Sequence, residues 1–131
     1  MTAPSEDIKD YIVSLGTLGL TFATNLFIAN EPAEPNNCVT IKDYGGYGTD
    51  LGLTTQGYER PSIQIMVRNT GYIAGYALAE SIQVALHGLS HQTINGTVYT
   101  VIYCTSGPAS LGKDESGREK FSINFNLQRK G

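Results

Sequence analysis

The chain has 131 residues and a formal net charge of −3, a size that suits one domain, residues 1–131, which would bury roughly two-thirds of its unfolded surface. This acidic balance argues against a protein that grips nucleic-acid phosphates with a basic surface. The sequence begins Met-Thr-Ala-Pro-Ser-Glu-Asp, and we expect neither a signal peptide nor a membrane-spanning segment. Cys38 and Cys104 lie beside β-branched and aromatic residues, which predicts buried, reduced thiols and a cytosolic setting.

The first predicted element is a helix. Ser5 is its expected N-cap, and Gly16 is expected to end it. One apolar stripe at helical spacing would face the core; it consists of Ile8, Tyr11, Ile12 and Leu15.

Three predicted strands follow this helix. They cover residues 25–29, 38–42 and 62–68, and a proline- and asparagine-rich turn at 31–37 separates the first two. In the third strand Ile63, Ile65 and Val67 alternate with polar residues. A second helix is predicted over residues 72–87, capped by Asn69 or Thr70 and stopped by Gly88.

The last third of the chain is predicted to be strands. Asn95-Gly96 is a strong hairpin signal, and residues 98–104 are apolar in the way of a strand covered on both faces. The final strand has polar residues between its apolar ones, which favours a solvated outer face; the apolar set is Phe121, Ile123, Phe125 and Leu127. The order α-β-β-β-α-β-β-β predicts an α+β fold, with an antiparallel or mixed sheet and two helices packed on one face.

Two long polar loops are predicted, at residues 43–60 and 105–119. The first is rich in glycine and tyrosine, and loops of that length without their own structure are usually functional or disordered. Tyrosine is favoured at protein contact surfaces, so we expect an arm that orders against a partner. The alternative is a surface loop without a role.

Each catalytic or metal-binding template fails on spacing or context. His87 and His91 are four residues apart, but Gly88 interrupts the helix and no glutamate follows His87. A zinc site that joins them to Cys38 and Cys104 is conceivable, although polar residues at a helix end are the simpler interpretation. The glycine-rich loop lacks the ending of a phosphate loop and precedes a strand. The sequence therefore predicts no enzyme and no cofactor.

Several segments together resemble the tail terminator proteins of long-tailed phages, a family also described as minor capsid or tail-to-head joining proteins. The resemblance covers residues 8–129 and is carried by the first helix, the glycine-rich loop, and five further segments. These segments are Asn-Leu-Phe-Ile at 25–28, Tyr-Glu-Arg-Pro-Ser-Ile-Gln-Ile-Met-Val-Arg at 58–68, Tyr-Ala-Leu-Ala at 76–79, Leu-Gly-Lys-Asp-Glu-Ser-Gly-Arg at 111–118, and Phe-Ser-Ile-Asn-Phe at 121–125.

The resemblance implies a small α+β domain that assembles as a six-fold ring on the finished tail tube. Such a ring stops tube polymerisation and offers a docking surface to the head. The implied partners are further copies of the chain, the major tail tube protein and the head completion or connector protein; DNA would pass through the channel without specific binding. The implied location is the tail or neck of a virion assembled in the host cytoplasm.

The family offers no fixed signature for the ring contacts, so the interface residues are predicted from loop chemistry. They are Tyr44, Tyr47, Asp50, Leu51, Leu53, Tyr58, Arg60, Lys113, Asp114 and Arg118. Three other functions stay open at this point. One is a small-ligand-binding module with the glycine loop as a lid, another is a different neck or tail-completion protein, and the least favoured is an enzyme using Asp43, Arg68 and His87.

Overall fold

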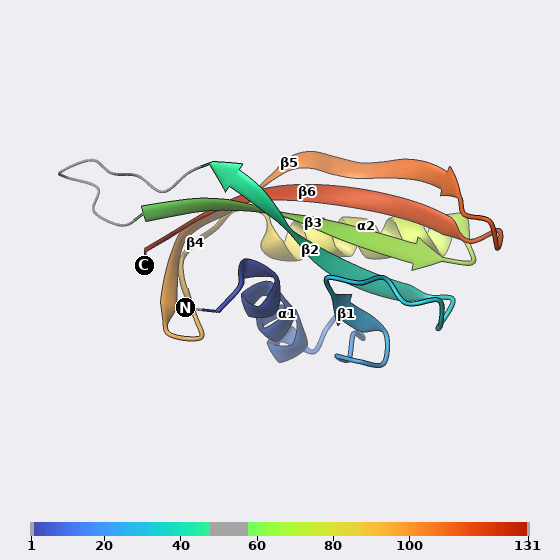
Figure 1. Cartoon of the computed structure of the whole chain (residues 1–131), viewed down its shortest axis with the longest axis horizontal. Coiled ribbons are helices and arrows are strands. Elements are labelled where there is room, and N and C mark those ends of the chain that lie inside the picture. Colours follow the sequence, from blue (N-terminus) through green and yellow to red (C-terminus); the bar gives the residue numbers. More distant parts are fainter. Residues whose placement is uncertain (1, 48–57, 131) are drawn as a thin grey trace.

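A computed structural model describes residues 2–47 and 58–130. Its elements follow one another as α1 (Pro4–Leu15), β1 (Leu26–Ile28), β2 (Cys38–Tyr47), β3 (Tyr58–Asn69), α2 (Tyr72–Leu86), β4 (Leu89–Ile94), β5 (Thr97–Lys113) and β6 (Glu119–Lys130) (Figure 1). The strands form one sheet in the order β1-β2-β3-β6-β5-β4. β1 runs parallel to β2, and the other neighbouring pairs are antiparallel. The predicted α+β class with a mixed sheet is confirmed.

The sheet is curled into a half-barrel, a curvature that the alternation of residues along a strand does not reveal. The two helices therefore lie against different parts of it (Figure 1): α1 contacts β1 to β4, whereas α2 contacts β3, β5 and β6. Buried side chains from both helices and from all six strands form one core cluster. The predicted alternation of β6 is confirmed, because its four apolar side chains lie in this core and are at most 1% exposed.

The first helix begins differently from the prediction. Its N-cap is Ala3, without a side-chain hydrogen bond, and Pro4 occupies the first turn, where its fixed φ suits a helix start. The predicted Ser5 cap is wrong, because the Ser5 hydroxyl instead donates to Oδ2 of Asp43 on β2 at 2.6 Å. Gly16 ends the helix as predicted, with a left-handed φ of 67°.

The second helix also lacks its predicted cap. Gly71 is the N-cap residue, and neither Asn69 nor Thr70 caps the helix. The side chain of Asn69 is used instead to accept a hydrogen bond from the Gly71 N–H at 2.9 Å. The Asn95-Gly96 hairpin between β4 and β5 is confirmed, and both residues have positive φ, 52° and 78°.

The strands extend into both predicted loops. β5 continues through Lys113 and pairs with β6 as far as Glu119, so the loop predicted at 105–119 is wrong over its first nine residues. Register shifts along β5 accommodate its serine, glycine and proline residues, which had suggested a loop. The loop predicted at 43–60 is likewise strand at both ends, up to Tyr47 and from Tyr58.

The middle of β5 is not covered on both faces, as had been predicted. Val98 is 36% exposed and Tyr103 is 40% exposed, while Tyr99 and Ile102 are fully buried. The two faces of this strand therefore differ: one belongs to the core, and the other belongs to the outer surface of the half-barrel.

Candidate interaction surfaces

The predicted interface residues fall at two opposite ends of the sheet. Tyr44, Tyr58 and Arg60 lie where β2 ends and β3 begins, whereas Lys113 and Asp114 lie at the turn between β5 and β6, together with Arg118 (Figure 1). Tyr47 is the last residue of β2. The remaining three predicted residues lie outside the described residues; they are Asp50, Leu51 and Leu53.

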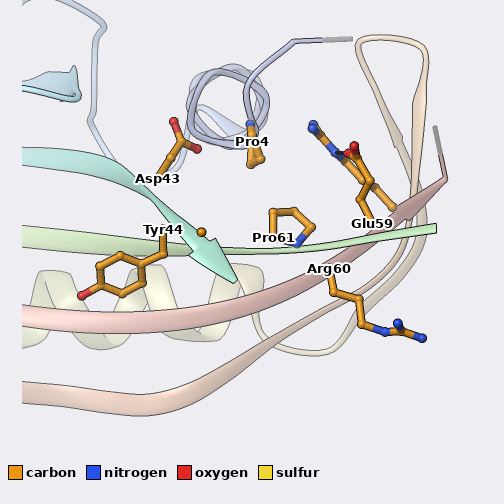
Figure 2. A pocket seen from close by; sticks show the side chains of 8 residues that line it. Pro4, Asp43, Tyr44, Glu59, Arg60 and Pro61 are labelled. Atoms are coloured by element: carbon orange, nitrogen blue, oxygen red, sulfur yellow. Dashed lines mark hydrogen bonds and ion pairs between the residues drawn. The ribbon is translucent and has the colours of Figure 1, made fainter. Parts of the chain in front are cut away.

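The end formed by β2 and β3 contains a small pocket of about 190 Å³. Figure 2 shows that Asp43 and Glu59 point toward the side where α1 lies, while Tyr44 and Arg60 point away from it. The alternation of side chains along a strand explains this split, since neighbouring residues face opposite sides of the sheet. Tyr44, 45% exposed, is accessible for contact with a partner.

A polar network fastens α1 to this end of the sheet. Asp7 on α1 is fully buried, and its carboxylate accepts hydrogen bonds from the Tyr99 hydroxyl at 2.5 Å, from Asn95 Nδ2 at 2.9 Å and from the Thr2 hydroxyl. Arg129 Nη1 lies 3.7 Å from the same carboxylate. Burial and the hydrogen bond to Asp7 raise the pKa of Tyr99, so this phenol stays protonated and remains a donor.

The same network fixes the two strand ends. Arg129 Nε donates to Glu59 Oε1 at 2.7 Å near the start of β3, and Ser5 bonds Asp43 near the end of β2 through both its N–H and its hydroxyl. A buried polar group carries a large cost unless it is hydrogen-bonded, and the buried carboxylate of Asp7 has such partners; the more exposed carboxylates of Asp43 and Glu59 have partners as well. The strands that lead into and out of residues 48–57 are therefore held by the first turn of α1.

The opposite end is a compact turn built on Asp114. Its carboxylate accepts the backbone N–H groups of Ser116 and Arg118 at 3.0 and 2.9 Å, and pairs with the Arg118 guanidinium at 2.9 Å. The hydrogen bond from the Arg118 backbone N–H, followed by the hydrogen bond and positive charge of the Arg118 guanidinium, holds the pKa of Asp114 below its usual value. Arg118 also donates to the carbonyl of Ala33 at 2.6 Å. This turn is thus tied to the loop that follows β1.

A second set of ion pairs holds that loop across the sheet. Glu31 lies 3.0 Å from Lys120 Nζ and 3.4 Å from Arg68 Nη1. Arg68, only 2% exposed, also donates to the carbonyl of Pro35 at 2.7 Å. Asp114, Arg118 and Arg68 therefore have structural partners, and of the three predicted contact residues at this end Lys113 alone is classed as exposed.

Sequence reasoning missed the outer face of α2. Tyr72, Ile73, Tyr76 and Val84 are 50%, 85%, 39% and 75% exposed. A helix that is apolar around its whole circumference is normally buried on all sides. The sequence showed that α2 is such a helix, because Glu80 is its single charged residue. The exposed apolar face of α2 is therefore a third candidate contact surface.

The described residues contain no group of three or more His, Cys, Asp and Glu side chains placed to hold a metal ion. His87 instead accepts a hydrogen bond from the N–H of Cys104 at 2.9 Å through Nδ1. Both cysteines are free thiols; Cys38 is buried as predicted, whereas Cys104 is partly exposed. Within residues 2–47 and 58–130, neither helix has the length and apolar character needed to cross a membrane.

The comparisons with known proteins agree with the resemblance seen in the sequence. The chain belongs to the family described as bacteriophage tail terminator protein, whose model matches residues 9–130. No curated protein sequence matches it. A solved chain from a structure described as "Virion of native gene transfer agent (GTA) particle" shares the fold, with a TM-score of 0.74 at 14% sequence identity over 98% of this chain and 96% of that chain. The protein is accordingly a viral structural protein of the virion tail.

Proposed function

We propose that this protein forms a hexameric ring that caps the tail tube. The ring ends polymerisation of the major tail tube protein and provides the surface on which the head completion or connector protein docks. It works without a cofactor and catalyses no reaction, and DNA passes through its channel without specific binding. The observation that carries the proposal is the match to the tail terminator family over residues 9–130.

The arrangement of the candidate contact residues supports a ring. Subunits that meet head-to-tail use two different patches, and a suitable rotation closes them into a ring. Here the predicted contacts lie at opposite ends of one sheet, around Tyr44 and Arg60 and around Lys113. Each contact between subunits would bury on the order of 1,600 Å² if it is of standard size.

Assembly of tail tubes from purified tube protein tests this function. We expect that adding the protein stops elongation and leaves rings visible at tube ends by negative-stain imaging. Deleting residues 46–57, most of the predicted contact arm, should abolish capping and preserve the circular dichroism spectrum of the folded chain. The proposal fails if tubes elongate equally with and without the intact protein, and the role of the arm fails if the deletion variant still caps tubes.

The ligand-binding alternative receives less support. The pocket where β2 ends and β3 begins measures about 190 Å³ in the described part of the chain. Pockets for small ligands usually measure about 300–1,000 Å³. Its lining also includes two acidic residues, Asp43 and Glu59, and two basic ones, Arg60 and Arg129, so the net charge of the lining favours neither sign.

A further inference from the structure

A hollow of about 400 Å³ lies where the second half of α2 meets the segment that follows α1. We call it the α2 hollow, and it is lined by Thr17, Leu18, Glu80, Ser81, Val84 and Ala85. Most of this lining is itself exposed to solvent, namely Thr17, Glu80, Ser81 and Val84. Pockets for small ligands instead bury most of the ligand's surface, so this open hollow is better suited to a side chain of another protein.

The α2 hollow combines aliphatic walls with one negative charge. Leu18, Val84 and Ala85 supply the apolar part, and Val84 is 75% exposed. Glu80 lies one helical turn before Val84, about 6 Å away along the helix axis. Within the described residues, the Glu80 side chain has no hydrogen-bond or ion-pair partner. The hollow therefore suits an aliphatic side chain that is accompanied by a cation at a similar spacing.

The end of β5 presents such a pair of side chains, Leu111 and Lys113, which we call the β5 tip. Leu111 is 55% exposed, and a register shift between Ser110 and Gly112 leaves it without a partner in the β5–β6 ladder. Lys113 follows two residues later, about 6–7 Å further along the strand. The turn that follows them lies at the far end of the sheet (Figure 1). The β5 tip is therefore placed to reach another subunit.

Lys113 is the cation at this end that is available to a partner. It is exposed, and it lies opposite Glu119 in the ladder without forming an ion pair with it in the described part of the chain. The nearby charges of Asp114 and Arg118 already neutralise each other. The exposed acid of the turn, Glu115, lies beyond the end of the strand.

We propose that the β5 tip of one subunit docks in the α2 hollow of the next, with Leu111 between Leu18 and Val84 and with Lys113 facing Glu80. The two surfaces match in apolar character, in charge and in the spacing of the two groups. They are also unlike each other, as a head-to-tail contact requires. This contact rests on the proposed function: it keeps the Lys113 end as one patch of the ring and makes the α2 hollow, in place of the Tyr44 end, the other.

Charge exchange tests the contact directly. Glu80→Lys alone and Lys113→Glu alone each place like charges across the interface, and we expect each variant to self-associate about tenfold more weakly, or worse, than the natural chain. A chain that carries both changes restores opposite charges at every contact and should regain association. Glu34→Lys is the matched control, since it reverses an exposed acid in the loop after β1, and it should associate normally.

The apolar part of the contact has its own test. Leu111→Ser removes the side chain that enters the hollow, and Ser81→Trp fills the hollow; each should weaken association about tenfold or more. Both positions are exposed, so the circular dichroism spectrum should stay that of the folded chain. Val98→Ser is the control, because Val98 is an exposed apolar residue of β5 outside the tip.

Association would be measured by sedimentation velocity, with added tail tubes if the free subunits remain monomeric. Unchanged association of the charge variants and of the apolar variants would overturn the proposed contact but leave the ring intact. Weakened association of the charge variants without rescue in the double variant would also overturn it, because Lys113 and Glu80 would then have other partners. A natural chain that forms no oligomer, even on tubes, would refute the proposed ring and this contact with it.

Cross-linking gives a measurement that does not depend on charge. In a Cys104→Ser background, which leaves only the buried Cys38, mild oxidation of a chain carrying Leu111→Cys and Val84→Cys should yield a ladder of covalent oligomers. Each single cysteine variant should give no cross-link. A dimer from the Val84→Cys variant alone would reveal a symmetric contact between two α2 helices and would refute the proposed contact, as would rings that form without any cross-link.

Discussion

Replacing Gly75 by alanine should destabilise the protein, against the usual preference of helices. In an exposed helix interior, alanine is favoured over glycine by about 1 kcal/mol. At Gly75 an added Cβ would lie 2.7 Å from Cε2 of Phe121 and 3.0 Å from Cβ of Asn69. Phe121 is fully buried and lies between the rings of Tyr72 and Tyr76, at centroid distances of 5.1 and 6.0 Å, so it cannot move aside freely.

Overpacking of a well-packed core costs about 1–3 kcal/mol. Because the new methyl group would be crowded from two sides, we take the upper half of that range, and the helix preference then leaves a net loss of about 1–2 kcal/mol. Urea unfolding followed by circular dichroism, at a concentration where the chain is monomeric, measures this change. Ala77→Gly, an exposed position in the same helix, is the control and should cost about 1 kcal/mol.

A second test of the same packing concerns Phe121. In a Phe121→Leu background the clash is relieved, so Gly75→Ala should cost less there than in the natural chain, and the difference is the coupling energy between the two sites. Stabilisation by Gly75→Ala in the natural chain, as at an ordinary helix position, would refute the close packing of α2 on β6.

Three further predictions concern the core, the buried network and the buried thiol. Phe125→Ala should lower the free energy of unfolding by about 3–5 kcal/mol, because Phe125 is fully buried; a loss below about 1 kcal/mol in urea titration would place it outside the core. Arg129→Ala should cost about 3 kcal/mol by leaving Asp7 without its positive partner, and adding Asp7→Asn should return part of that loss; a larger loss in the double variant would contradict this pairing. Burial raises the pKa of Cys38 above its ordinary 9.0, so this thiol ionises in the unfolded chain at a lower pH than in the folded chain. The free energy of unfolding should therefore fall as the pH rises above about 9. Thermal melts from pH 8 to 10 should show a shallower decline of the melting temperature for Cys38→Ala than for the natural chain.

Patterns among neighbouring residues correctly predicted β6 and the hairpin between β4 and β5. The alternation of Phe121, Ile123 and Phe125 placed β6, and Asn95-Gly96 placed the hairpin between β4 and β5. These signals succeed because side-chain direction along a strand and positive φ in a turn depend on adjacent residues.

The interactions that sequence reasoning missed join residues far apart in the chain. Asp7 meets Tyr99 across 92 positions, and Ser5 leaves its expected cap to bond Asp43 across 38 positions. The far half of β5 is strand because β6 pairs with it, although its own composition suggests a loop. Among the candidate contact surfaces, loop chemistry predicted Tyr44 and Arg60, a prediction that stays untested. It passed over α2, because an apolar helix is expected to be buried until the structure shows that one of its faces is exposed.

The position of β6 has a consequence for the timing of folding. This strand is made after every other strand, yet it lies at the middle of the sheet, between β3 and β5. Without residues 119–130, the ladders that remain are β1-β2-β3 and β4-β5, and no backbone pairing connects them. The half-barrel can therefore close only after β6 has been synthesised.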